Sequence, residues 1–178
     1  REDMASDYDP VLVKRGYGEI GNDTYVSLDL SSTFDVRDVD ISEITKAELE
    51  EYKNLGEICF PQWDNSIEFS QLCFDLSLRD DEDMIYKNLS IVRDGKMVCF
   101  GSVLVSRKLK LAYFHNVGTH PDYRRLGLFT LLNKKLCNMA YEFGTETVFV
   151  IVEDDGASYR GYEKLGFVKV EKYLLYCG

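Results

Sequence analysis

The spacing of apolar residues predicts one long helix, over residues 126–143. Its apolar positions recur every three or four residues: Leu128, Leu132, Leu136, Met139 and Phe143. Gly144 follows, at a place where helices commonly end on a residue in the left-handed conformation. The next segment, 147–152, is apolar at nearly every position, which is typical of a strand buried on both faces.

Two shorter helices are predicted in the first half of the chain, over 45–59 and 66–78. Thr45 stands at the cap position of the first helix, and Glu48 follows three residues later in a capping-box arrangement. The remaining predicted elements are strands over 35–41, 110–119 and 167–176 and a short helix over 157–165.

A β-hairpin is predicted where strand-like residues 89–93 and 97–105 flank Asp94-Gly95, a pair that favours a two-residue turn. Strands and helices therefore alternate along most of the chain. We predict an α/β fold, with one mixed β-sheet and helices on both of its faces. A length of 178 residues is sufficient for one well-buried core.

Composition argues against several classes of partner. A formal net charge of -10 disfavours nucleic acid, because binding it requires neutralising phosphates. The longest apolar run, Val148–Val152, is far shorter than the ~20 residues that span a bilayer, so no membrane partner is predicted. Two histidines and scattered cysteines without a CxxC pair predict no metal site. Free, mostly buried thiols suit a reducing compartment, and we expect a cytoplasmic protein.

The strongest chemical signal lies where the strand over 110–119 leads into the long helix. A His120-Pro121 turn follows the strand, and then come Arg124-Arg125 and Gly127. Backbone N–H groups at a helix N-terminus, the helix dipole and two cations together favour a phosphate group. We therefore predict that the backbone N–H groups of residues 125–130 bind a phosphate-bearing ligand.

A second glycine pattern, Gly16–Gly21, has the GxGxxG spacing of dinucleotide-binding loops. That mechanism requires a strand before the glycines and a helix after them. The following residues, Thr24–Leu30, are rich in strand formers and have no helical period. A dinucleotide site is therefore not predicted here.

The segment Arg124–Phe129, read Arg-Arg-Leu-Gly-Leu-Phe, resembles the R/Q-x-x-G-x-G/A motif of the GNAT (GCN5-related N-acetyltransferase) superfamily. A second family-like block, Tyr162–Phe167, follows the next strand at the usual distance. The resemblance covers roughly residues 34–178. It implies a GNAT fold and an enzyme that moves an acetyl group from acetyl-CoA, its co-substrate, to an amine by direct attack on the thioester. The acceptor would be a small-molecule or peptide amine, and no metal is implied. The alternative is a catalytically silent module that binds or senses acyl-CoA.

The resemblance also assigns cofactor-binding positions. The strand before the motif would hold the pantetheine arm, and the motif would hold the pyrophosphate. The assigned positions are Val117, Gly118, Thr119, Arg124, Arg125, Leu126, Gly127, Leu128, Phe129, Thr130, Asp155 and Ser158. Two of them depart from the family pattern: Phe129 stands where Gly or Ala is usual, and Asp155 stands near where Asn is often found.

Four residues are candidates for catalysis. Tyr162 matches the tyrosine that often protonates the leaving thiolate; a packing role for its ring is the alternative. The strand Leu111–Val117 has no carboxylate to serve as general base. Strand periodicity places Tyr113, His115, Val117 and Thr119 on one face, so His115 is a candidate base or a structural histidine. Glu153 and Asp154, just past the next strand, are the other candidate bases.

Two further segments are interpreted by analogy. The family's acceptor pocket is walled by the first two helices and their loop, which here hold Phe60, Trp63, Asp64 and Glu68. These side chains suit an ammonium group or form a solvated hydrophobic wedge. Residues 1–33 are an N-terminal extension before a domain at 34–178. Because residues 14–20 resemble 164–170, the extension is the tail of a preceding GNAT-like unit, an added edge strand or a chance match.

Overall fold

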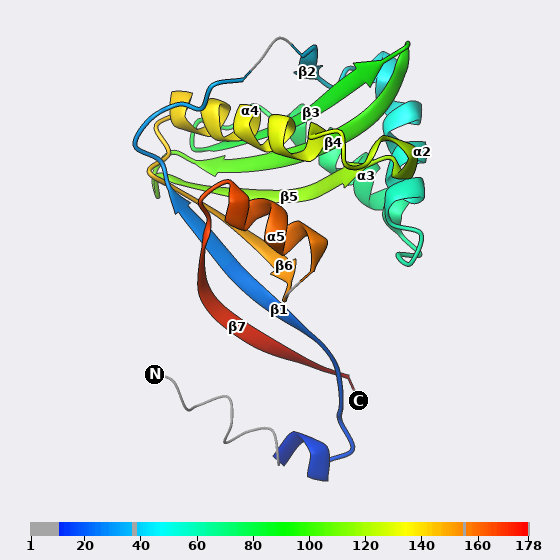
Figure 1. Cartoon of the computed structure of the whole chain (residues 1–178), viewed down its shortest axis with the longest axis vertical. Coiled ribbons are helices and arrows are strands. Elements are labelled where there is room, and N and C mark those ends of the chain that lie inside the picture. Colours follow the sequence, from blue (N-terminus) through cyan, green and yellow to red (C-terminus); the bar gives the residue numbers. More distant parts are fainter. Residues whose placement is uncertain (1–10, 37–38, 155, 178) are drawn as a thin grey trace. The chain divides into compact units, whose positions relative to one another are not determined.

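The structure is a computed structural model that describes residues 11–36, 39–154 and 156–177. The described residues form an α/β fold with seven strands (Figure 1). Contacts divide the chain into two compact units. The larger unit comprises residues 28–149, and the smaller comprises 1–27 together with 150–178. The predicted α/β class is confirmed.

The larger unit contains four complete strands and the start of a fifth. They are β2 (Ile41–Glu43), β3 (Met84–Arg93), β4 (Lys96–Ser106), β5 (Leu111–Thr119) and the beginning of β6 (Thr147–Glu153). Strands β2 to β5 are antiparallel neighbours in that order. Asp94 and Gly95 both have positive φ, 51° and 73°, as the tight turn between β3 and β4 requires. The predicted hairpin is confirmed.

Helices cover both faces of these strands (Figure 1). They are η1 (Lys46–Glu48), α2 (Leu49–Cys59), α3 (Ser66–Ser77) and α4 (Leu128–Glu142). Tyr52 of α2 packs edge-on against Phe100 of β4, with ring centroids 5.1 Å apart. A Cβ on the next residue, Gly101, would lie 3.0 Å from Leu132 of α4. Because successive strand residues face opposite sides, α2 and α3 cover one face and α4 covers the other.

The ends of these helices follow from local sequence. The backbone N–H and hydroxyl of Thr45 both donate to the Glu48 carboxylate, over 2.8 and 2.7 Å. This contact confirms the predicted start of the first helical segment. Gly144 has φ 85°, so the long helix ends at the predicted glycine, although α4 begins at Leu128, two residues later than predicted.

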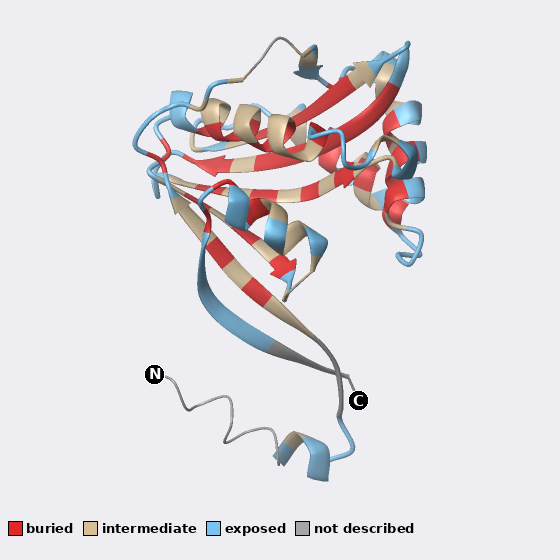
Figure 2. Cartoon of the chain, viewed as in Figure 1, coloured by how far each residue is buried: buried red, intermediate tan, exposed pale blue. Residues whose placement is uncertain are grey.

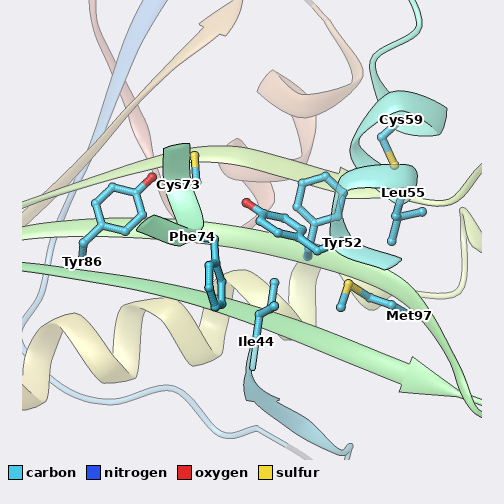
Figure 3. Packing of buried hydrophobic residues seen from close by; sticks show 9 residues of the cluster. Ile44, Tyr52, Leu55, Cys59, Cys73, Phe74, Tyr86 and Met97 are labelled. Atoms are coloured by element: carbon cyan, nitrogen blue, oxygen red, sulfur yellow. The ribbon is translucent and has the colours of Figure 1, made fainter. Parts of the chain in front are cut away.

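Buried residues concentrate in β3, β4 and β5 and on the sides of the helices that face them (Figure 2). The α2–α3 face, meaning the side of β3–β5 covered by α2 and α3, carries a core cluster (Figure 3). Its members are Ile44, Tyr52, Leu55, Cys59, Cys73, Phe74, Tyr86, Met97 and Phe100. Tyr52 and Tyr86 both direct their hydroxyls toward Cys73 in Figure 3. The α2–α3 face therefore has a polar centre inside an apolar layer.

The smaller unit contains the end of β6 followed by α5 (Ala157–Lys164) and β7 (Val168–Cys177), and most of β1 (Gly18–Asp29). Strand β1 lies between β6 and β7 and is antiparallel to β7. Residues 24–29 of the strand-rich segment are thus in β1. Whether residues 1–33 are an addition to the domain or the tail of a preceding unit stays a prediction.

Asp154, just past β6, is the electrostatic centre of the smaller unit. Its carboxylate accepts hydrogen bonds from Lys169 at 2.7 Å, Lys172 at 2.8 Å and the Thr24 hydroxyl at 2.7 Å. The side chain is only 8% exposed. The lysines, Lys169 foremost, and the hydroxyl hold the pKa of Asp154 well below its ordinary value. The carboxylate therefore joins β1 and β7 to the residue that follows β6.

The predicted strand over 35–41 is wrong for the residues described there. Only Ile41 belongs to a strand, β2, while residues 34–36 have no regular structure. Asn138 of α4 accepts a hydrogen bond from the Phe34 N–H at 2.6 Å and donates to the Phe34 carbonyl at 2.9 Å. An α4 side chain thus satisfies backbone groups that a sheet neighbour would otherwise pair.

Candidate active site

Strand β5 contains a β-bulge in the middle of the predicted site. His115 lies opposite Ser102 of β4, and Gly118 lies opposite Phe100. One residue of β4, Gly101, therefore faces two residues of β5, Asn116 and Val117. Asn116 has φ 49°, in the left-handed region that asparagine adopts more readily than most residues. A bulge of this kind bends the strand and leaves an extra residue outside the regular ladder.

The bulge corrects the predicted side-chain alternation along β5. Tyr113 and His115 lie on the α2–α3 face, where the His115 ring meets Phe69 of α3. Val117 instead lies on the α4 face, because its Cγ2 would contact a Cβ at Gly101 beside Leu132. Of the four residues predicted to share one face, Tyr113 and His115 therefore lie on the α2–α3 face, and Val117 and Thr119 lie on the α4 face. The extra residue at the bulge reverses the alternation beyond it.

Thr119 also lies on the α4 face, and its hydroxyl is 3.2 Å from the thiol of Cys99. Gly118 lies on the α2–α3 face, where a Cβ would come within 2.7 Å of the Phe100 ring and 3.0 Å of the Cys59 Cβ. A side chain larger than hydrogen would displace these core groups. The glycine is therefore required for packing where β5 ends.

Asn116 connects the bulge to a buried polar network on the α2–α3 face. Its Nδ2 donates to the Tyr52 hydroxyl at 2.7 Å, and that hydroxyl lies 3.5 Å from Ser102. Ser102 donates to Oδ1 of Asn88 at 2.6 Å, and Nδ2 of Asn88 donates to the Cys73 carbonyl at 2.9 Å. The network joins α2, α3, β3, β4 and β5, so it holds the bulge against the helices that cover it.

His115 is partly buried within aromatic side chains of the α2–α3 face. The Tyr86 hydroxyl of β3 lies 2.6 Å from its Nε2. The Tyr113 ring stacks on the imidazole with centroids 5.1 Å apart, and Phe69 meets it edge-on at 6.0 Å. Burial lowers the pKa of His115 to about 4. The imidazole is therefore neutral at physiological pH.

The predicted acceptor wall forms an aromatic cluster next to His115. Phe60 stacks on Trp63 with centroids 4.6 Å apart, and Trp63 meets Phe69 edge-on at 6.4 Å. A continuous series of ring contacts thus runs from Trp63, which is 48% exposed, through Phe69 to His115. Asp64 and Glu68 are exposed on the same segment, so this surface combines aromatic and acidic groups.

The loop between β5 and α4 has the backbone geometry of an anion site. His120 accepts a hydrogen bond from the Asp122 N–H through its Nδ1, which shapes the 3-10 turn η2 (Pro121–Tyr123). Arg124 donates from Nε to the Thr119 carbonyl at 3.2 Å, so its guanidinium is held beside the end of β5. Arg125 has φ 64° and Gly127 has φ 78°. Left-handed residues before a helix direct backbone N–H groups into a concave anion-binding arrangement.

The N-terminus of α4 itself is prepared for a negatively charged ligand. Gly127, its N-cap, makes no side-chain cap hydrogen bond, and no acidic residue occupies the first turn. No atom of the described residues lies within 4 Å of the position that a Cβ on Gly127 would take. The first turn of a helix carries N–H groups without intrahelical partners and a partial positive charge. These features fit the predicted pyrophosphate position.

Phe129 lies in the first turn of α4. Its side chain is partly buried, and its carbonyl accepts a hydrogen bond from Nδ2 of Asn133 at 2.8 Å. Leu128 before it is 1% exposed and anchors the helix in the core, whereas Leu126 is exposed in the loop. Backbone N–H groups do not depend on side-chain size, so this departure from the family motif is compatible with phosphate binding.

The other predicted site residues belong to the smaller unit. Tyr162 of α5 is buried, and its ring packs against Phe167 with centroids 5.0 Å apart. Glu153 is exposed at the end of β6, and Ser158 is partly buried in the first turn of α5. Asp155 lies outside the described residues.

Within the described ranges, no three His, Cys, Asp or Glu side chains gather as a metal site would require. Cys59, Cys73, Cys99 and Cys137 are free and buried, as predicted for them. In the same ranges, no helix has the length and apolar character needed to cross a bilayer.

The comparisons with known proteins identify the family. A family model described as "Acetyltransferase (GNAT) family" matches residues 47–167, more than half of the chain. The chain therefore belongs to the GNAT acetyltransferase family. The match includes the β5 bulge, the loop before α4 and the block that contains Tyr162.

Two similar proteins act on a ribosomal protein by name. The chain is 26% identical over 95 residues to the [Ribosomal protein bS18]-alanine N-acetyltransferase of Haemophilus influenzae, covering 53% of this chain and 64% of that protein. The fold resembles the Escherichia coli ribosomal-protein-S18-alanine N-acetyltransferase, with a TM-score of 0.60 and 23% identity over 74% of this chain and 78% of that one. The chain thus spans less than two thirds of the Haemophilus relative.

A third similar structure covers almost the whole chain. It is a GCN5-related N-acetyltransferase from Sphaerobacter thermophilus, with a TM-score of 0.76 and 16% identity. The alignment covers 98% of this chain and 56% of that protein. At this level of identity the likeness establishes the fold, and it confirms the GNAT fold predicted from the motifs.

Sequence reasoning missed two residues of the site, Tyr86 and Asn116. The sequence signal for Asn116 is an asparagine inside an apolar strand, because asparagine tolerates positive φ where most residues do not. Tyr86 lies before the predicted start of its strand at residue 89, and nothing local indicates its contact with His115, 29 residues away.

Proposed function

We propose that this domain transfers the acetyl group of acetyl-CoA to a primary amine. The observation that carries the proposal is the uncapped N-terminus of α4 behind two left-handed residues, Arg125 and Gly127, at the end of a bulged strand. Membership of the GNAT family supports the same reaction. The free, buried thiols support a reducing, cytoplasmic location.

The residues of the larger unit fit this co-substrate. Backbone N–H groups of residues 125–130 would bind its pyrophosphate, with Arg124 and Arg125 contributing positive charge to an otherwise acidic chain. Backbone groups of Val117 and Thr119 would hold the pantetheine arm, as the family resemblance implies. When bound, acetyl-CoA supplies an acetyl group activated as a thioester.

Two residues of the smaller unit are proposed to move protons, on the family resemblance and on chemistry. Tyr162 would protonate the departing thiolate; general acids typically contribute roughly 10²–10⁴-fold. Glu153 would receive the proton of the acceptor amine through water. For His115, a pKa of about 4 provides little driving force for deprotonating an amine, which favours another role for this residue.

We further propose that the acceptor is an α-amino group of a peptide or a similarly weak base. An α-amino group has a pKa near 7.7–8.0, so about a tenth of it is neutral and nucleophilic at pH 7. A lysine side chain, with a pKa near 10.4, is neutral in less than about 0.1% of molecules. No strong base lies on β5, which favours an acceptor that arrives neutral. The two relatives named for acetylating a ribosomal-protein alanine support this choice.

The second candidate function is a silent module that binds acyl-CoA without transferring it. The absence of a carboxylate from β5 favours it. Isothermal titration with acetyl-CoA, followed by a free-thiol assay over a panel of amines, separates the two. Binding together with amine-dependent thiol release supports the enzyme. Binding without release for any amine supports the silent module, and the absence of binding contradicts both.

A further inference from the structure

We propose that Tyr86 is a positioning residue that fixes His115 in the tautomer with its proton on Nδ1, so that His115 acts as a neutral hydrogen-bond donor to the thioester carbonyl. This inference rests on the proposed acetyl transfer and assigns a role within the same site. Nothing in the family motif requires it, because neither residue belongs to the motif.

The distance between Tyr86 and His115 indicates which of them donates. The Oη to Nε2 distance is 2.6 Å. An N–H donor to oxygen normally lies 2.7–3.2 Å from its acceptor, with most near 2.9 Å, whereas hydroxyl donors reach shorter distances. The Tyr86 hydroxyl therefore donates and Nε2 accepts. An imidazole that accepts at Nε2 while neutral carries its proton on Nδ1.

The surroundings keep both partners in the neutral form that this bond requires. Burial raises the pKa of Tyr86 far above its ordinary value, so the phenol keeps the proton that it donates. Burial lowers the pKa of His115 to about 4, so Nε2 keeps its lone pair. The nearby Cys73 thiol is also buried, and the pKa of Cys73 is raised. The pair therefore carries no charge at physiological pH.

The side chains around Tyr86 and His115 are consistent with both residues being neutral. Within the described part of the chain, the imidazole meets the side chains of Tyr86, Tyr113 and Phe69, and none of these three is a carboxylate or a cation. Tyr86 in turn is surrounded by Cys73, Tyr52 and Ser102. Asp64 and Glu68, the acidic residues of the aromatic segment, are exposed to solvent.

The polar network fixes the side chains that surround Tyr86. A backbone carbonyl only accepts, so the bond to the Cys73 carbonyl orients the Asn88 amide and leaves its Oδ1 to accept from Ser102. The Ser102 hydroxyl thus uses its only proton on Asn88, and it keeps lone pairs to accept from the Tyr52 hydroxyl, 3.5 Å away. Ser102 thus uses both its proton and its lone pairs in hydrogen bonds, which holds the side chains next to Tyr86 and His115 in place.

The chemical consequence concerns the reacting carbonyl. When the amine nitrogen bonds to the acetyl carbon, negative charge develops on the thioester oxygen before the carbon–sulfur bond breaks. A neutral imidazole N–H stabilises that charge and keeps its proton throughout the reaction. The amine proton leaves to Glu153 and water, and the thiolate takes a proton from Tyr162. Removing one such donor from an acyl-transfer site costs about 10²–10³-fold in turnover.

The test compares three replacements of His115 with a Tyr86 variant. His115→Asn places an amide N–H near the position of Nδ1 but cannot act as a base, His115→Gln places it near Nε2, and His115→Ala removes both. We expect kcat to fall about 100-fold in the alanine variant and to recover at least about tenfold in the asparagine variant. KM for the amine should change little. Equal losses in all three variants would overturn the donor role.

The tautomer is measured independently of activity by ¹⁵N NMR of the histidine ring. The proposal requires a protonated Nδ1 in the wild type and a shift toward protonated Nε2 in Tyr86→Phe. Tyr141→Phe, on the exposed side of α4, is the matched control and should leave the spectrum unchanged. A protonated Nε2 in the wild type would refute the inference even if acetyl transfer is observed. A wild type that binds acetyl-CoA but transfers nothing would refute the proposed function instead.

Discussion

Asn116 donates a 2.7 Å hydrogen bond to the buried hydroxyl of Tyr52, and it does so from a left-handed backbone conformation inside a β-strand. The bond joins the β5 bulge to helix α2. It explains how a strained residue persists in the sheet, because strain of this kind is retained only where surrounding contacts over-determine it. The bulge then decides which β5 side chains lie on the α2–α3 face and which lie on the α4 face.

Two substitutions of Asn116 separate its hydrogen bond from its backbone conformation. Both variants lose the bond, but Asn116→Ala keeps a Cβ at φ 49°, which costs about 1–2 kcal/mol, whereas Asn116→Gly removes that Cβ and its cost. We expect the glycine variant to be more stable than the alanine variant by about 1 kcal/mol in urea unfolding. Glycine normally destabilises a strand relative to alanine. If the alanine variant were instead more stable than the glycine variant, residue 116 would not have the left-handed conformation that the bulge requires.

Gly127 and Gly144 form a matched pair at the two ends of α4. Their φ values are 78° and 85°, and both have open space where a Cβ would lie. Replacement by alanine should destabilise the protein by a similar amount at either site, about 1–2 kcal/mol. Only Gly127→Ala should weaken acetyl-CoA binding, by about tenfold, because it disturbs N–H groups at the proposed phosphate site. Titration calorimetry measures the affinity of both variants for acetyl-CoA. Equal affinities would contradict a phosphate site at the N-terminus of α4.

The buried imidazole of His115 makes stability depend on pH. Its pKa is about 4 in the folded protein against an ordinary value of 6.5, so the unfolded chain binds the proton more tightly. Stability should therefore fall as the pH drops below 6.5, by about 3 kcal/mol at pH 4 from this group. In His115→Asn this part of the pH dependence should disappear. Identical pH profiles of the unfolding free energy in variant and wild type would show that His115 is not buried as described.

Asp154 should be a major determinant of stability in the smaller unit. Its three partners lower its pKa, so its contribution is present above the ordinary carboxyl pKa of 3.8 and is lost as the pH falls below that value. Asp154→Asn should lower the melting temperature at neutral pH because both lysines lose their anionic partner. Asp122→Asn is the matched control, since the Asp122 side chain is 85% exposed. An equal melting temperature for both variants would argue against the ionic cluster.

The sequence predicted most accurately what depends on neighbours in the chain. The apolar spacing of α4, the Thr45–Glu48 cap and the Asp94-Gly95 turn are local signals, and each corresponds to an element of the structure. The motif before α4 likewise predicted a loop whose backbone geometry suits an anion. These features depend on local spacing and backbone conformation.

Features that depend on distant partners were not predictable. Alternation alone suggested a strand at 35–41, but Asn138 satisfies the backbone of Phe34 across 104 residues. The same rule placed Val117 beside His115, because periodicity cannot include the extra residue of a bulge. The contact between Tyr86 and His115 requires the register of β3, β4 and β5, which no local pattern specifies.

The central claim is acetyl transfer from acetyl-CoA to an α-amine, and one measurement tests it most directly. The protein is incubated with acetyl-CoA and a peptide that has one free N-terminus and one internal lysine, and the product is fragmented in a mass spectrometer. We expect a single acetyl group on the α-amine, formed only when protein is present, and no product from the same peptide with a blocked N-terminus. Acetylation of the lysine alone would contradict the proposed acceptor. No acetylation of this peptide or of any amine tested, with acetyl-CoA bound, would contradict the proposed enzyme.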